Sequence, residues 1–488
     1  MTKELRRLSI IVLFMFLSLF VATSWIQVVN APTLNEDVNN RRTLYDSYEV
    51  QRGSIIAGGE EIVTSIASDD LYAWQRQYAN ADVWSTVTGW INPVLQSTEG
   101  LERAMNQELS GQASSAFFSR IDQILSGQDP RGSSIELSLE PAAQQAAYDA
   151  LVNRGYTGAV VAVEPSTGRI LAMVSTPGYD TNQLALHDGD AVNANYTALE
   201  ADALEPLQNR AIAGDLYPPG STFKLVTATA AIASGDYTMD STFPNVAAYT
   251  LPSSSAVVSN ADGGTCGSGD TVTLRDAIRL SCNVPMAELA VELGEDAIRE
   301  AAESYGFNRS FETPLPSTAS SYPSLAGDDA QTGLTGFGQG QVTATPLQMA
   351  MVAAGIANDG VVMNPWMVDD VIGPDLSVQE TYDPTAFGEA LDADLADALT
   401  EAMTASVQDG AATNARIDGV DVAGKTGTAE NADDDPYTLW FTGFAPADDP
   451  QVAVAVVVED GGGQGQSGSG NTIAAPIAKE VMEAVLAR

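Results

Sequence analysis

The sequence predicts an α/β protein whose central sheet is covered by helices on both faces. The segment GAVVAVEPSTGRILAMVS (158–175) places two apolar runs around a Pro-Ser-Thr-Gly turn, which is typical of a β-hairpin. The segment QVAVAVVVE (451–459) is apolar at nearly every position, so a strand there must be buried on both faces. A further strand is expected at 438–446, and the apolar helix expected at 475–487 can provide one cover.

The remaining segments place this sheet behind a smaller membrane-proximal domain. Pro141 opens a helical pattern, and much of 284–355 is helical and loop-rich, which indicates a large helical insertion. SGQDPRGSS (126–134) has the composition of a connector. The predicted domains are a cytoplasmic tail (1–7), a transmembrane anchor (8–29), an N-terminal non-catalytic domain (30–139) and a C-terminal domain (140–488) with its core from about 158.

The N-terminus predicts a membrane anchor. Lys3, Arg6 and Arg7 precede the apolar run Leu8–Val29. As a helix this run can span about 30 Å of hydrocarbon, and the basic flank places the N-terminus in the cytoplasm. A cleaved signal peptide is the alternative, but the run is long for one and no A-x-A site follows. Both readings put most of the chain outside the cytoplasm.

Composition excludes several classes of function. The 22 basic and 64 acidic residues give a net charge of −42, which argues against binding to nucleic acid. His187 is the single histidine, in a loop-like stretch, so a multi-histidine zinc site is impossible and no metal or cofactor is expected. Lysine occurs only at Lys3, Lys224, Lys425 and Lys479.

The two cysteines, Cys266 and Cys282, are expected to form a disulfide. Disulfides form and persist outside the cytoplasm. The alternative is a pair of buried thiols.

The segment DLYPPGSTFKL (215–225) contains a candidate nucleophile and its base. Pro218 and Pro219 favour a helix start, after which Ser221 and Lys224 share one helix face. A serine hydroxyl needs a base, and lysine becomes one when burial or a second cation lowers its pKa. Alone, the S-x-x-K pattern is weak evidence for a nucleophile and its base, because two unrelated surface residues give the same pattern.

Two further segments carry polar groups suited to a cleft. In RLSCNVPM, Ser281 and Asn283 can relay a proton and hold a substrate amide, although a helix cap is the simpler explanation. In VAGKTGTAE, which is predicted to be a strand, Gly427 would let a substrate backbone lie close. Lys425 and the hydroxyls of Thr426 and Thr428 suit a carboxylate, the alternative being an ordinary glycine-containing strand end.

In this order and spacing, 60 and then 144 residues apart, the three motifs resemble the set of the active-site-serine penicillin-recognising enzymes. The stretches PLQNRAIAGDLYPPGSTFKL, TGFGQGQVTATPLQMA and YTLWFTGFAP resemble the transpeptidase domain of penicillin-binding proteins. QRGSI (51–55) and STEGLERAMNQELSG (97–111) are similar to the N-terminal domain of the actinobacterial penicillin-binding protein A group. Roughly 110 residues before the C-terminal domain are too few for a glycosyltransferase domain, so the chain resembles a monofunctional class B member.

The resemblance implies a penicillin-binding/serine transpeptidase fold. That fold has a central, mostly antiparallel five-stranded sheet flanked by helices and a helical subdomain, here behind a transmembrane helix and a small pedestal domain. It implies that Ser221 attacks the penultimate D-Ala carbonyl of a peptidoglycan stem peptide and forms an acyl-enzyme. An amine from a neighbouring stem then takes the acyl group, and β-lactams acylate Ser221 instead.

The resemblance also implies a role for each motif residue. Lys224 would be the base, Ser281 would pass a proton to the leaving amine, and Asn283 would hold the donor peptide. Lys425 would position Ser281 and, together with burial, lower the pKa of Lys224. Thr426 and Thr428 would bind the terminal carboxylate, and the oxyanion hole would be the backbone N–H groups of Ser221 and Thr428.

Other functions stay open at this point. A D-alanyl-D-alanine carboxypeptidase would use the same motifs with water as acceptor, and a non-catalytic divisome scaffold would use residues 30–139. A β-lactamase or a β-lactam sensor is disfavoured, because no deacylating acid can be assigned and only seven residues precede the anchor. By analogy alone, a SEDS-family glycosyltransferase and divisome proteins are expected partners. Thr181 stands where many relatives carry proline, which is interpreted as loop variation.

Overall fold

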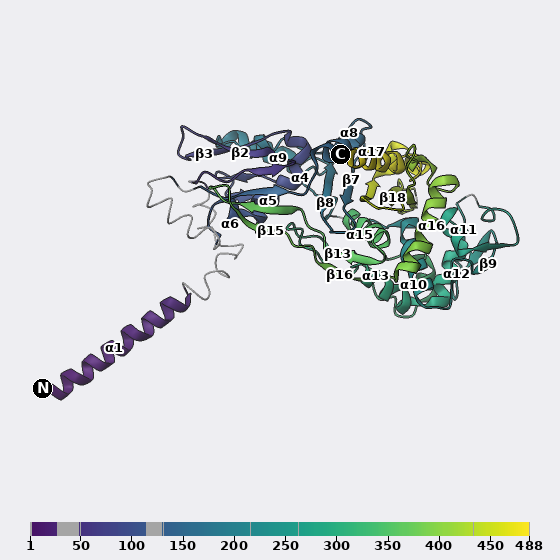
Figure 1. Ribbon diagram of the computed structural model, residues 1–488, viewed down its shortest axis with the longest axis horizontal. Helices are drawn as coiled ribbons and strands as arrows, with labels where there is room; N and C mark the ends of the chain where they lie inside the picture. Colours follow the sequence, from purple (N-terminus) through teal and green to yellow (C-terminus); the bar gives the residue numbers. More distant parts are fainter. Residues whose placement is uncertain are drawn as a thin grey trace.

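The computed structural model contains an N-terminal helix, an N-terminal sheet and a C-terminal α/β domain (Figure 1). It describes residues 2–26, 48, 50–113, 129, 131–214, 216–261, 263–432 and 434–487. Helix α1 (Thr2–Ser24) has a window of mean hydropathy 2.1, none of it buried, and is long and apolar enough to cross a membrane. Residues 27–29 of the predicted anchor, most of the stretch that follows it, and residues 126–128 and 130 of the predicted connector lie outside the described residues.

The C-terminal domain is built on a five-stranded sheet in the order β17-β18-β19-β7-β8, and every neighbouring pair is antiparallel. The strands predicted from 158–175, 438–446 and 451–459 are confirmed. Their bounds are β7 (Gly158–Val163), β8 (Ile170–Thr176), β17 (Ala423–Ala429), β18 (Thr438–Ala445) and β19 (Val452–Val458).

Two apolar cores lie on the two faces of this sheet. Helices α8 (Pro141–Val152) and α17 (Ala474–Leu486) pack on one face with Val454 and Val456. Helix α15 (Pro346–Ala357) packs on the other face with Val457. Because successive side chains of a strand alternate between faces, a strand covered on both must be apolar throughout. Each fully buried valine contributes about 1.5–3 kcal/mol, and this explains the unbroken apolar run of β19.

The predicted helical insertion packs beside β17 and below the sheet in Figure 1. It includes η4 and α10, described below, and three two-stranded sheets. Its helices are α11 (Leu274–Arg279), α12 (Val284–Leu293), α13 (Glu295–Ser304), α14 (Asp329–Thr335), α16 (Ala393–Asp409) and η5 (Thr413–Ala415). The helical segments η3 (Thr181–Gln183) and α9 (Gly189–Glu200) lie instead beside the N-terminal domain (Figure 1). The small strands are β9 (Thr242–Pro244), β10 (Ala248–Thr250), β11 (Val257–Ser259), β12 (Thr271–Thr273), β13 (Val361–Met363) and β16 (Ala386–Glu389).

The N-terminal domain holds a six-stranded sheet in the order β15-β14-β6-β1-β2-β3, in which only β1 and β6 pair in parallel. Two of its strands come from residues 368–381, far along the chain, so the sheet ties the two domains together. The elements are β1 (Ile55–Ala57), β2 (Glu60–Ala67), β3 (Trp74–Tyr78), α4 (Ala81–Thr88), β4 (Ile91–Asn92), β5 (Ser97–Thr98), α5 (Gly100–Ala104), α6 (Asn106–Leu109), β6 (Ser134–Leu137), β14 (Val368–Ile372) and β15 (Val378–Thr381).

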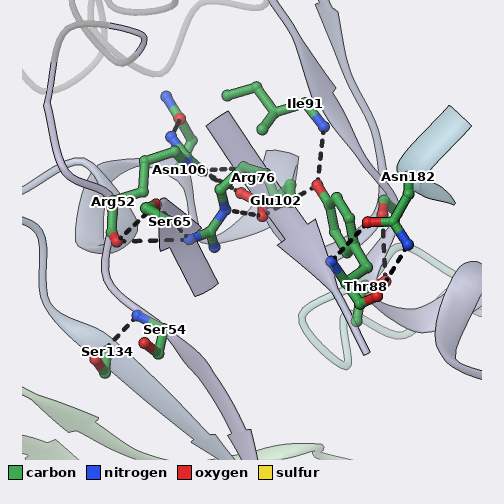
Figure 2. Close-up of polar contacts among 12 residues, drawn as sticks. Arg52, Ser54, Ser65, Arg76, Thr88, Ile91, Glu102, Asn106, Ser134 and Asn182 are labelled. Atoms are coloured by element: carbon green, nitrogen blue, oxygen red, sulfur yellow. Dashed lines mark hydrogen bonds and ion pairs between the residues drawn. The ribbon is translucent and has the colours of Figure 1, made fainter. Parts of the chain in front are cut away.

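A buried ion cluster holds this N-terminal domain together (Figure 2). The Glu102 carboxylate, fully buried, accepts hydrogen bonds from Arg52 Nε at 2.9 Å and from Arg76 Nε at 2.6 Å. The Tyr78 hydroxyl donates to the same carboxylate at 3.3 Å, and Arg52 Nη1 donates to Asn106 Oδ1 at 2.6 Å. Burial alone would raise the pKa of Glu102, but the two guanidinium groups outweigh it and the pKa is lowered.

Side chains from the C-terminal domain close the open edge of this sheet at β3. The Asn182 amide donates to Tyr78 O and accepts from Tyr78 N, both at 2.9 Å (Figure 2). Thr181 beside it is fully buried, so this position belongs to the domain contact. His187, expected in a surface loop, is half-buried and its Nδ1 lies 2.5 Å from Asp70 Oδ2. It therefore also links the two domains.

Candidate active site

Ser221 lies in a helical turn that is fixed from two sides. The turn, η4 (Gly220–Phe223), continues into α10 (Lys224–Ala233), as the paired prolines predicted. Trp440 Nε1 donates to Pro218 O at 2.9 Å, and Gly220 N donates to Gly338 O at 2.9 Å. A Cβ on Gly338 would lie 1.9 Å from Gly220 O, so only glycine allows this approach. The Ser221 hydroxyl makes no hydrogen bond to the part of the chain that the structure describes.

Strand β17, an edge strand, runs beside η4. Side-chain alternation puts Lys425 and Gly427 on the face toward η4. A Cβ on Gly427 would lie 2.9 Å from Trp440 Cβ and 3.0 Å from Pro219 O. The space that this glycine leaves free is therefore filled by the turn that carries Ser221. The sequence predicts a substrate backbone in that space, whereas in the structure the turn occupies it.

The backbone at Thr428 faces the open edge of the sheet. A Cβ on Gly220 would lie 3.0 Å from Thr428 O, so this carbonyl points at η4 and away from β18. The N–H of a strand residue points to the same side as its C=O, and the second residue of a helical turn has a free N–H. Ser221 and Thr428 therefore both have N–H groups available for the predicted oxyanion hole.

Lys224 and Lys425 converge on the hydroxyl of Ser281. Lys425 Nζ lies 2.7 Å from Ser281 Oγ and 2.9 Å from Thr426 O. Lys224 Nζ lies 3.3 Å from Ser281 Oγ, and 2.7 Å from both Ser281 O and Asn283 Oδ1. The two ammonium groups therefore meet at Ser281, as expected, while Lys224 makes no described hydrogen bond to Ser221.

Both lysine side chains are fully buried, and no carboxylate pairs with either of them among the described residues. Burial, with Lys425 as the second cause, lowers the pKa of Lys224 well below its ordinary value. Burial alone lowers the pKa of Lys425 to about 7. Both causes that were expected to lower the pKa of Lys224 are thus present.

These contacts suit a neutral amine at Lys224. A neutral amine has two N–H groups, and the structure supplies two carbonyl acceptors at 2.7 Å, Ser281 O and Asn283 Oδ1. The lone pair is then free to accept a proton. A protonated Lys425 can donate to Ser281 Oγ, whose own hydrogen can point to Lys224. The Ser281 hydroxyl can therefore pass a proton between the two lysines.

Ser281 occupies a special position at the end of α11. Ser281 N donates to Ile278 O and Cys282 N donates to Ala277 O, the pair of bonds that defines a Schellman motif. Its φ of 62° is left-handed, where glycine is usual, so the serine is strained here. The expected disulfide between Cys266 and Cys282 is present and holds the residue that follows.

Asn283 stands at the N-cap position of α12, which was the alternative explanation for this motif. Its side chain, however, makes no cap hydrogen bond. The amide instead accepts from Lys224 and donates to Ser259 O at 3.0 Å. Asn283 therefore occupies the N-cap position of α12, but its side chain contacts Lys224 and makes no cap hydrogen bond.

The two threonine hydroxyls of the third motif face away from Lys425. Thr426 Oγ1 donates to Ala411 O at 3.2 Å, and Thr428 Oγ1 accepts from Gly470 N at 3.4 Å. Gly470 ends the glycine-rich stretch 461–470, which forms the turns η6 (Asp460–Gly463) and η7 (Gly465–Ser467) and packs against β17.

Sequence reasoning missed the side chains that hold η4 in place. Glu459 Oε1 accepts from the Tyr217 hydroxyl at 2.5 Å and from Arg210 Nε at 2.9 Å, and Tyr217 packs edge-on against Trp440. The available signal was the polar Glu459 that directly follows a fully apolar strand. His187 contacts none of the motif residues, and the described ranges hold no cluster of three or more acidic, cysteine or histidine residues suited to a metal.

The site has the arrangement of a serine acyltransferase. It combines a serine at the start of a helix with two buried lysines, and the adjacent edge strand offers N–H groups for an oxyanion. Comparison with known families agrees. Residues 158–483 match the penicillin binding protein transpeptidase domain, and residues 52–135 match the penicillin binding protein A dimerisation domain. The chain belongs to the penicillin-binding protein transpeptidase family.

Relatives extend the similarity over the full length. The chain is 40% identical to peptidoglycan D,D-transpeptidase PbpA of Mycolicibacterium smegmatis, covering 100% of this chain and 99% of the relative. It is 39% identical to PbpA of Mycobacterium tuberculosis strain H37Rv, with the same coverage. The structure of M. tuberculosis penicillin-binding protein A as a ceftriaxone acyl-enzyme complex superposes with a TM-score of 0.87, over 90% of this chain and 99% of that one.

Proposed function

We propose that this chain is a peptidoglycan D,D-transpeptidase that works through an acyl-enzyme on Ser221 and is acylated at the same residue by β-lactams. The observation that carries the residue assignment is the convergence of two buried lysines on the Ser281 hydroxyl. One of them, Lys224, lies one helical turn from Ser221. The full-length similarity to transpeptidases and to a β-lactam acyl-enzyme supports the reaction class.

The reaction begins with attack of Ser221 Oγ on the carbonyl carbon of the penultimate D-Ala. Lys224, neutral because it is buried beside Lys425, takes the hydroxyl proton. The N–H groups of Ser221 and Thr428 stabilise the oxyanion that forms on the carbonyl oxygen. The C–N bond then breaks, and the leaving D-Ala nitrogen receives the proton through Ser281.

Deacylation repeats these steps in reverse with a new amine. The acceptor amine of a neighbouring stem attacks the Ser221 ester and gives up a proton along the Ser281 route. The new amide bond forms and the proton returns to Ser221 Oγ. Thr426 and Thr428 lie along the edge of β17, where a donor peptide would run, and Asn283 stands on the opposite side beside Lys224.

The membrane arrangement completes the proposal. Helix α1 would anchor the chain in the plasma membrane with residues 1–7 in the cytoplasm and the catalytic domain outside, as the basic flank indicates. The disulfide Cys266–Cys282 fits an oxidising compartment. A SEDS-family glycosyltransferase and divisome proteins remain predicted partners from the resemblance.

Labelling with a fluorescent penicillin tests the assignment. The full-length protein in detergent should form a covalent adduct, and Ser221→Ala should abolish it while leaving Tm unchanged. An unlabelled wild-type protein, or a labelled Ser221→Ala variant, would overturn the proposal. Incubation with a donor peptide and an amine acceptor then separates cross-linked product from the hydrolysed product that a carboxypeptidase would release.

A further inference from the structure

The start of helix α12 raises a question about hydrogen bonding. The first N–H groups of a helix have no partner within it, and asparagine at the N-cap is one of the best residues to satisfy them. Asn283 stands at that position, yet its side chain is committed to Lys224 and Ser259. The N–H groups at this helix start therefore need another acceptor.

Asn260 supplies that acceptor from a different part of the chain. Its Oδ1 accepts from Asn283 N at 3.0 Å and from Val284 N at 3.1 Å. Its Nδ2 donates to Gly264 O at 2.9 Å and to Val246 O at 3.4 Å, which fixes the orientation of the amide. Asn260 is only 8% exposed, so water cannot readily replace these bonds.

We infer that Asn260 is a positioning residue of the active site: by accepting the N–H groups of Asn283 and Val284, it fixes the backbone from which the Asn283 amide reaches Lys224. The inference rests on the proposed function. Nothing in the three sequence motifs points to Asn260, because its effect reaches the lysine only through Asn283.

Two features of the surrounding loop agree with this role. In the chain between β9 and β12, the Asn245 side chain holds the backbone of Cys266. Asn245 Oδ1 accepts from Cys266 N at 2.7 Å, and its Nδ2 donates to Cys266 O at 3.0 Å. The disulfide then joins Cys266 to Cys282. Two contacts therefore restrain the chain just after the strained Ser281: the disulfide at Cys282, and the hydrogen bond from Asn283 N to Asn260.

Removing Asn260 leaves the N–H groups of Asn283 and Val284 without their acceptor, so the start of α12 should shift and the Asn283 amide should no longer hold Lys224. We expect Asn260→Ala to lower the second-order rate of acylation by a fluorescent penicillin about tenfold, and to move the midpoint of its pH profile. The charged group that acts on Lys224 is Lys425, and it is unchanged in this variant. Asn283→Ala should lower the rate at least as much, and Asn260→Ala in that background should lower it no further.

Each other variant has a defined outcome. Asn260→Asp keeps the acceptor oxygen and should recover most of the rate. Asn245→Ala loosens the same loop without touching Asn283, so it should lower Tm but leave the pH profile in place. A wild-type protein that penicillin does not label would defeat the proposed function. A labelled wild type whose Asn260→Ala variant keeps its rate and pH profile, or whose double variant shows multiplied losses, would defeat this inference alone.

Discussion

The two domains each bury a cluster of charged side chains, and the clusters are arranged in opposite ways. In the N-terminal domain the Glu102 carboxylate lies between Arg52 and Arg76, and hydrogen bonds connect all three. In the C-terminal domain Lys224 and Lys425 are buried together around a serine hydroxyl, with no described carboxylate. The first cluster lowers the pKa of its acid and so favours the carboxylate, whereas the second lowers the pKa of its bases and favours a neutral amine.

This difference separates a cluster that serves stability from one that serves chemistry. Burial of a carboxylate between two guanidinium groups is compensated while all three are present, and it becomes strongly destabilising when one partner is removed. Two like charges buried together are costly from the start, and the fold retains them because a neutral lysine is a usable base. Substitution in the two clusters should therefore affect different measurements.

Lys224→Met should produce the largest effect. General-base catalysis is worth about 10²–10⁴-fold, so acylation by penicillin should fall by about 10³-fold. Tm should change little, because the variant removes a desolvated amine beside Lys425 but leaves Ser281 O and Asn283 Oδ1 without their donor. Stopped-flow labelling and thermal unfolding of the detergent-solubilised protein measure the two quantities. A variant that acylates at the wild-type rate would remove Lys224 from the mechanism.

Glu102→Gln should show the reverse behaviour. It leaves two buried guanidinium groups without their anion and should lower the free energy of unfolding by about 3–5 kcal/mol. The acylation rate of the folded protein should not change. Glu99→Gln is the matched control, since its ion pair with Arg103 at 3.8 Å is exposed and should be worth less than about 1 kcal/mol. Equal losses in both variants would contradict the structural role given to the buried cluster.

The two clusters also differ in how far the sequence predicts them. The proposed catalytic residues lie in three short motifs of fixed order, and strands β7 and β19 of the central sheet are apolar at every position, so both could be predicted. The Arg52–Glu102 pair joins residues 50 positions apart, and no local pattern marks it. For the same reason the strands from 368–381 in the N-terminal sheet and the cap provided by Asn260 were missed: each depends on contacts between distant segments.

The lysine cluster should also make the stability of the protein depend on pH. Burial lowers the pKa of Lys425 from 10.5 to about 7 in the folded protein, while the unfolded chain keeps the ordinary value. Between about pH 7 and 10.5 the unfolded state therefore binds more protons, and stability rises with pH. This one group contributes up to about 1.4 kcal/mol per pH unit in that window and nothing further below it. Lys425→Met should remove the contribution, so the difference in Tm between variant and wild type should shrink as pH rises from 7 to 10. A difference in Tm that stays constant over this range would show that Lys425 remains fully charged in the fold.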